Sequence, residues 1–220
     1  MPRRHASVAA EEDNSVDMSQ KMWVAVFLLG LPLAAQQPLP GLRIEPAGGG
    51  SIFYVRNDAS QPLTAYLVEL VDYPGSRYTL WQDDITDPTP PRVEKRIPVA
   101  SMLVGTVPDY VKVRAAIYAD GTSAGIPEKI AELVERRRVT LKTTRELIAR
   151  LTAAQAKEAP KPAVNDALRR WADSMTGTRQ AAARTLIVET AARLESESLP
   201  DALARLRAAE HAIAGSKPAL

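Results

Sequence analysis

The chain has 220 residues, of which 45% are hydrophobic and 25% charged, a composition typical of folded proteins with one large or two small domains. The formal net charge of +2 argues against a nucleic-acid-binding protein, whose surface is usually strongly basic. Cysteine is absent, which excludes disulfides, thiolate metal sites and cysteine nucleophiles. Only two histidines are present, so we expect neither a metal site nor a cofactor.

An apolar segment with the features of a secretory signal begins well inside the chain, at Met18. Lys21 supplies a positive charge ahead of an apolar run over residues 22–33. Ala34 and Ala35 then supply the small residues preferred before a cleavage site. The run is shorter than the ~20 residues that span a bilayer as a helix.

This pattern predicts a signal peptide over residues 18–35, followed by a linker over residues 36–41. Residues 1–17 are polar and lack periodicity, so we expect a non-native or disordered extension there. The predicted localisation is periplasmic or secreted, in a bacterium. The alternatives are an uncleaved membrane anchor and a buried helix.

The region after the linker alternates apolar and polar residues, as β-strands do. Strands are predicted at 50–57, 63–73, 76–84 and 110–121, with weaker candidates at 42–46, 93–99 and 101–107. The proline-rich stretch at 85–98 is predicted to be a loop or an edge strand. Six or seven short strands without a helix between them favour two packed antiparallel sheets. We therefore predict an immunoglobulin-like or fibronectin-like β-sandwich over residues 42–122.

The clearest predicted strand, 110–121, also suggests a surface for a partner. Its alternation predicts one apolar face, made of Val111, Val113, Ala115 and Ile117. The opposite, polar face carries the candidate partner contacts Lys112, Arg114 and Tyr118.

Helical periodicity replaces the alternation after Gly125, so the predicted fold class is α+β. A long helix over 126–159 opens a helical region over 126–215, and residues 216–220 form a tail. Further helices are predicted at 163–175, 178–196 and 199–214. On the long helix, the i,i+4 spacing favours the ion pairs Glu132–Arg136 and Glu146–Arg150. Residues 36–125 carry a net charge of −2 and residues 126–220 a net charge of +5, which supports a boundary near Gly125.

The stretch "GTSAG" at 121–125 matches the nucleophile motif of serine hydrolases, with Ser123 as the candidate nucleophile. His211 and an acid such as Asp201, Asp166 or Asp173 follow in the order that this fold requires. However, the hydrolase fold interleaves parallel strands with helices, whereas here the strands come first. A turn and a flexible hinge explain the motif more simply.

Two charged clusters have equally simple explanations. Asp83, Asp84 and Asp87 could bind calcium, but their spacing matches no calcium loop. Arg136 and Arg137 belong to a basic cluster that could contact a partner or anionic lipid, but an amphipathic helix with a charged outer face explains it more simply.

The stretches "YVRNDASQPLTAY" and "VRAAIYADGTSAG", followed by an "RRR" helix, resemble uncharacterised bacterial exported proteins. The resemblance covers residues 50–150. It implies an immunoglobulin-like β module joined to helices, and it implies no activity.

These observations favour a non-enzymatic envelope protein that binds another protein or self-associates through the 126–159 helix. A serine hydrolase using Ser123 is the alternative. We expect no nucleic acid among the partners, and contact with a membrane only through the signal segment or an uncleaved anchor.

Overall fold

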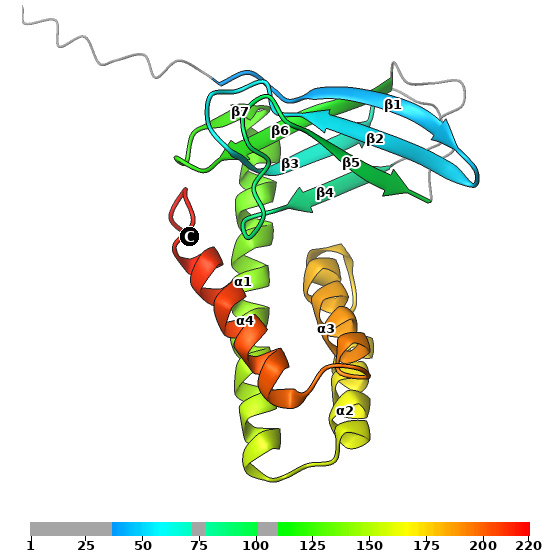
Figure 1. Cartoon of the computed structure of the whole chain (residues 1–220), viewed down its shortest axis with the longest axis vertical. Coiled ribbons are helices and arrows are strands. Elements are labelled where there is room, and N and C mark those ends of the chain that lie inside the picture. Colours follow the sequence, from blue (N-terminus) through cyan, green and yellow to red (C-terminus); the bar gives the residue numbers. More distant parts are fainter. Residues whose placement is uncertain (1–36, 72–77, 101–109) are drawn as a thin grey trace, which may run out of the picture. The chain divides into compact units, whose positions relative to one another are not determined.

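The computed structural model describes residues 37–71, 78–100 and 110–220, which all belong to one compact unit (Figure 1). The strands are β1 (Gly41–Ala47), β2 (Gly50–Arg56), β3 (Leu63–Leu70), β4 (Thr79–Asp83), β5 (Glu94–Val99), β6 (Val111–Tyr118) and β7 (Ser123–Gly125). The helices are α1 (Pro127–Ala156), α2 (Lys161–Asp173), α3 (Ala181–Arg193) and α4 (Leu199–Ala214), with a short 3-10 helix (Thr178–Gln180) before α3. The predicted signal peptide, the extension before it and the weak strand at 101–107 lie outside the described residues.

Two antiparallel sheets form the N-terminal part of this unit. One has the strand order β1-β2-β5 and the other β4-β3-β6-β7. They share a core of apolar side chains to which both sheets contribute, including Phe53, Val55, Tyr66, Val68 and Ala116. The strand β5 contains Pro98 and lies at the edge of its sheet, as predicted for the proline-rich stretch. The α+β class is therefore confirmed.

A β-bulge in β6 changes which side chains face the core. Leu67 pairs with Ala115 while Val68 pairs with Val113, so Arg114 is an extra residue without a partner across the ladder. The extra residue inverts the alternation that follows it. Ala116 and Tyr118 therefore point into the core between the sheets, as Val111 and Val113 do before the bulge. The prediction of a single apolar face from Val111 to Ile117 is wrong for this reason.

The second sheet is covered on both faces. Ala115 and Ile117 join Ala65 and Leu67 in a separate apolar cluster with Leu133 of α1. Six consecutive residues of β3 are consequently buried, where the alternation predicted one wet face. The tertiary contact with α1 overrides the pattern expected of a half-exposed antiparallel sheet.

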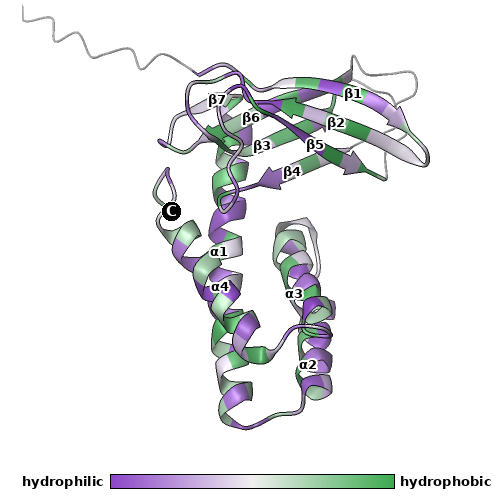
Figure 2. Cartoon of the chain, in the orientation of Figure 1, coloured by the Kyte–Doolittle hydropathy of each residue, from purple (hydrophilic) through white to green (hydrophobic). Residues whose placement is uncertain are grey.

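The C-terminal half of α1 belongs to a helical core. The helix α2 packs on α3, and α3 and α4 pack on α1. Leu147 and Leu151 of α1 are fully buried in this core. Figure 2 shows hydrophobic and hydrophilic residues alternating along all four helices, as expected where one face is buried. The apolar stripe of α1 is thus covered by the chain's own sheet and helices.

The helix boundaries follow local signals. Pro127 stands in the first turn of α1, where its missing N–H costs nothing. Ser198 caps α4, and its hydroxyl accepts a hydrogen bond from the backbone N–H of Asp201. The described part of the chain contains no helix that is both long enough and apolar enough to cross a membrane.

Candidate functional site

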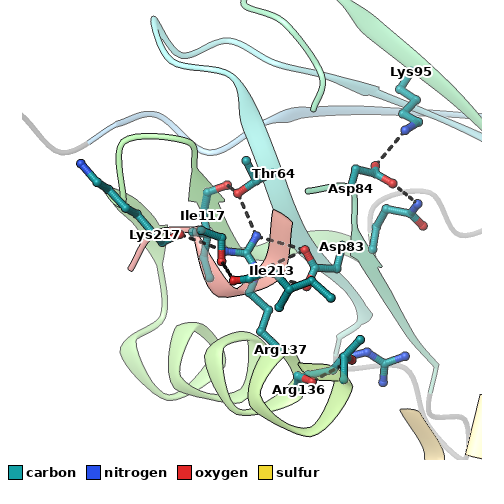
Figure 3. Close-up of polar contacts among 12 residues, drawn as sticks. Thr64, Asp83, Asp84, Lys95, Ile117, Arg136, Arg137, Ile213 and Lys217 are labelled. Carbon is teal, nitrogen blue, oxygen red and sulfur yellow. Dashed lines mark hydrogen bonds and ion pairs between the residues drawn. The ribbon is translucent and has the colours of Figure 1, made fainter. Parts of the chain in front are cut away.

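The most elaborate polar constellation surrounds Arg137 of α1, whose side chain is 0% exposed (Figure 3). Its Nε donates to the Asp83 carboxylate at the end of β4, with a distance of 3.0 Å to Oδ2. Its Nη2 donates to Thr64 Oγ1 at 2.8 Å, and Thr64 donates in turn to the carbonyl of Ile117 at 3.0 Å. Its Nη1 donates to the carbonyl of Lys217 at 3.0 Å. One guanidinium therefore joins α1 to two strands and to the C-terminal tail.

The charge of Asp83 depends on this arrangement. Burial raises the pKa of the Asp83 carboxyl above its ordinary value, and the hydrogen bonds and positive charge of Arg137 oppose that rise. A buried arginine needs such partners, because an unpaired buried charge is strongly destabilising. The hydrogen bonds of Arg137 fix α1 to β3, β4 and the C-terminal tail and leave none of its donors directed to solvent. We therefore assign Arg137 a structural role.

The prediction that Arg137 lies on a charged outer face is therefore wrong. The sequence contained a signal for its burial. Arg137 lies four residues after Leu133 and four before Leu141, so it occupies a position in the apolar stripe of α1. An arginine at such a position requires a buried partner, and only the fold reveals that the partner is Asp83.

Two further ion pairs connect separate elements. Lys95 of β5 lies 2.9 Å from Asp84, which follows β4, and this pair bridges the two sheets (Figure 3). Lys129 of α1 lies 2.7 Å from Glu69 of β3. Two of the three aspartates considered as calcium ligands are thus engaged in ion pairs, Asp83 with Arg137 and Asp84 with Lys95. Within the described ranges, no group of three or more histidine or acidic side chains is placed to hold a metal ion.

The remaining candidate partner contacts separate by exposure. Lys112 is exposed on β6, whereas Arg114 is half-buried and lies 3.7 Å from Glu69. Arg136 is half-buried with its guanidinium over the Trp81 ring, 5.5 Å from its centroid, in place of the predicted ion pair with Glu132. Lys112 is therefore the member of the predicted set that is open to a partner.

Tyr118 lies in the interior, so its prediction as an exposed partner contact is wrong. Its side chain is 0% exposed because the bulge at Arg114 turns it toward the core. Its hydroxyl donates a hydrogen bond to the carbonyl of Pro38, which ties the start of the described chain to β6. Burial, and then the charge of Asp58, raise the pKa of Tyr118 to about 12.

Tyr118 is accordingly expected to ionise about two pH units later than an exposed tyrosine. Because its folded-state pKa is raised, its contribution to stability is fully present below pH ~10 and is lost as the pH rises toward 12. Absorbance at 295 nm during an alkaline titration measures this ionisation. Tyr118→Phe should reduce the late component by one tyrosine, because burial also raises the pKa of Tyr66, and it should cost about 1 kcal/mol at neutral pH. If Tyr118→Phe instead removed absorbance that develops at about pH 10, where exposed tyrosines ionise, the assignment of a buried hydroxyl to Tyr118 would be wrong.

The predicted hydrolase residues are not assembled into a triad. Asp201 and His211 stand in the first and last turns of α4, ten residues apart, which separates them by about 15 Å along the helix. Ser123 lies in β7 opposite Ile117, in a regular strand and not in a flexible hinge. A nucleophile elbow requires a strained serine, but among the described non-glycine residues only Arg92 and Glu158 have positive φ.

Surface hollows occur on the helical part of the described chain, and three of them are considered as ligand sites. The first, of about 680 Å³, lies at the α2–α3 turn beside Thr176 and Val188. The second, of about 350 Å³, is lined by Arg138, Lys142 and Arg145 of α1. The third, of about 330 Å³, is a groove between α1 and α2 with mostly apolar walls. Of these three hollows, the groove between α1 and α2 is the one whose charged lining residues, Arg150 and Lys157, are all cationic.

Comparison with known proteins found no matching family model, no curated protein and no solved structure with significant similarity.

Proposed function

We propose that the chain is an exported, non-enzymatic module of the bacterial envelope that binds another protein through the uncovered face of the β1-β2-β5 sheet. The observation that carries this proposal is the contrast between the two sheets. The helix α1 covers the outer face of the second sheet and contacts β3, β6 and β7, whereas among the described residues no helix makes a comparable contact with β1, β2 or β5. A sheet face without a covering layer is available to a partner.

A row of three cross-strand neighbours characterises this open face. Arg43 pairs with Tyr54, and Tyr54 pairs with Arg96 on the next strand. The Arg43 guanidinium stacks on the Tyr54 ring at 3.9 Å from its centroid. Tyrosine and arginine are enriched in protein interfaces and among their energetically important residues. Because the apolar stripe of α1 is already buried, we favour this row over the helix as the contact surface.

The strand distribution supports an immunoglobulin-like assignment for the sandwich. If β1, β2 and β5 correspond to strands A, B and E, then β3, β6 and β7 correspond to C, F and G. The strand β4 then takes the place next to C that strand C′ has in variable-type domains. Sandwiches of this kind are common in cell-surface domains, which agrees with the proposed export.

The sequence pattern over residues 18–35 supports export. Lys21, the apolar run over residues 22–33 and the small residues Ala34 and Ala35 follow one another in the order of a secretory signal.

Export is tested by expressing the chain from Met18 in a bacterium and sequencing the N-terminus of the periplasmic product. We expect the mature chain to start at Gln36. Replacing Ala35 by arginine should block cleavage and leave the product membrane-bound, because signal peptidase needs a small residue there. A cytoplasmic product that retains Met18 would overturn the export proposal.

The binding face is tested by placing a photo-crosslinking amino acid at Tyr54 and, as a control, at Val188 in α3. Both side chains reach the surface, but only Tyr54 belongs to the open sheet face. We expect a discrete cross-linked product with one envelope protein from position 54. No product, or equal products from both positions, would reject the face as the binding surface.

A further inference from the structure

We propose that the groove between α1 and α2 binds a straight-chain carboxylic amphiphile, with its carboxylate on Arg150 and its chain along the apolar walls. The walls consist of Leu151, Val164, Leu168 and five alanines. Helix α2 packs mainly on α3, and it meets α1 through the core side chains around Leu151 and Leu168 and through the contact of Trp171 with Arg150. Outside this contact the lining residues are mostly alanines, and their small side chains leave a groove of about 330 Å³. This site is independent of export and of the open sheet face.

The charge of the groove selects an anionic ligand. Arg150 and Lys157 are the charged residues that line it, and no carboxylate does. Arg150 lies on α1 and Lys157 directly follows this helix, seven residues further on, or about 10 Å along the axis. Within the part of the chain that the structure describes, neither cation forms an ion pair. An apolar slot with unpaired cations at its rim is complementary to a chain that carries an acidic head.

Arg150 is the better of the two cations for the carboxylate. Its guanidinium lies over the Trp171 ring at 4.2 Å from the centroid, in place of the predicted ion pair with Glu146. Stacking uses the flat face of the guanidinium and leaves its N–H edge free to bind a carboxylate with two parallel hydrogen bonds. Trp171 therefore holds the group in position without consuming its donors. Lys157 follows the last turn of α1, where a cation also complements the helix dipole.

The volume of the groove suits a short alkyl chain. At about 30 Å³ per non-hydrogen atom, the share of a molecule of liquid water, a groove of about 330 Å³ holds roughly eleven such atoms. This corresponds to the alkyl chain of dodecanoate, with the carboxylate outside the groove on Arg150.

The test is isothermal titration of the folded protein with dodecanoate below its micelle concentration. We expect saturable binding of one molecule per chain. Octanoate, with four fewer methylenes, should bind at least tenfold more weakly, because each buried methylene contributes up to about fourfold in affinity. Trp171 fluorescence should change on binding, since its ring lies against Arg150.

Variants separate this site from non-specific binding of a detergent-like molecule. Arg150→Gln should weaken dodecanoate binding at least fivefold, and Ala167→Leu, which narrows the groove from an exposed helix position, about tenfold. Lys142→Gln, in the neighbouring hollow, and Ala208→Leu, on the exposed side of α4, are the matched controls and should leave affinity unchanged. Ala163→Leu replaces Ala167→Leu if that variant does not fold.

The proposal would be overturned by equal binding of dodecyltrimethylammonium, by unchanged affinity in Arg150→Gln, or by the absence of saturable binding. Each of these results would leave the export and sheet-face proposals untouched. Conversely, a chain that stays in the cytoplasm could still bind dodecanoate in the purified state.

Discussion

Replacing Arg137 by methionine is expected to lower the free energy of unfolding by about 3–5 kcal/mol, because it leaves the Asp83 carboxylate without its buried counter-charge. The substitution also removes the donors that satisfy Thr64 and the Lys217 carbonyl. For a unit of this size the loss corresponds to a fall of roughly 6–20 °C in Tm. Urea unfolding followed by circular dichroism measures it.

Arg138→Met is the matched control, since Arg138 is the next residue of the same helix and its side chain is 52% exposed. Its ion pair with Glu135 is a surface pair, so we expect a change within about 0.5 kcal/mol. The double substitution Arg137→Met with Asp83→Leu should recover part of the loss, because it removes both charges together. Equal stability of the two single variants would show that the buried pair is not a determinant of the fold.

The effect of Arg137→Met should also depend on pH. Burial already raises the pKa of Asp83, and loss of the guanidinium raises it further. The pKa of Asp83 is higher in the folded state than in the unfolded state, where it is ~3.9. Protonated Asp83 therefore contributes stability that is fully present below pH ~3.9 and is lost as the pH rises through the folded-state pKa. The difference in stability between the variant and the parent should therefore shrink as the pH is lowered toward 4. A difference that grows in acid would contradict this assignment.

Gly125→Ala is expected to be the second most damaging substitution, with a loss of at least about 3 kcal/mol. Gly125 has φ +106°, a conformation that other residues rarely adopt. A Cβ atom there would lie 2.2 Å from the Arg114 carbonyl oxygen and 2.9 Å from the Ala115 Cα, and neither backbone atom can move without breaking the β6–β7 ladder. Thermal unfolding of the purified variant measures the loss.

Alanine substitutions at two other glycines distinguish the cost of backbone strain from the cost of steric overlap. Gly177 has φ +89° and ψ 162°, a backbone conformation nearly restricted to glycine, but open space around its Cα, so alanine there should cost only the conformational strain, about 1–3 kcal/mol. Gly48 has neither a strained conformation nor a close neighbour, and its substitution should be almost neutral. If Gly125→Ala were no worse than Gly177→Ala, the contact with Arg114 would not limit the connection between β7 and α1.

Local patterns predicted most of the elements because they act over a few residues. The strands at 50–57 and 63–73 and the helix at 199–214 were predicted within three residues of their observed bounds. The change of period near Gly125 predicted the order of sheets before helices, which the structure confirms. Pro127 in the first turn of α1 and the cap at Ser198 carry this information locally.

The candidate sites were less predictable because they depend on distant partners. The bulge at Arg114 is set by pairing with β3, and it reversed the predicted orientation of Tyr118. Arg136 and Arg150 had glutamates at the preferred helical spacing, yet both stack on tryptophans from other elements. A surface ion pair contributes so little that an aromatic ring presented by the fold can replace it.

The amino-acid sequence by itself determined where the strands and helices lie and that strands precede helices, because hydrophobic period and capping residues are local properties. Only the tertiary structure decided which faces are buried. It placed α1 against the second sheet, enclosed Arg137 with Asp83, and, among the described residues, left the β1-β2-β5 sheet without a covering helix and left a groove between α1 and α2. The physical reason is that burial of a side chain is decided by what packs against it, and those residues lie far away along the chain.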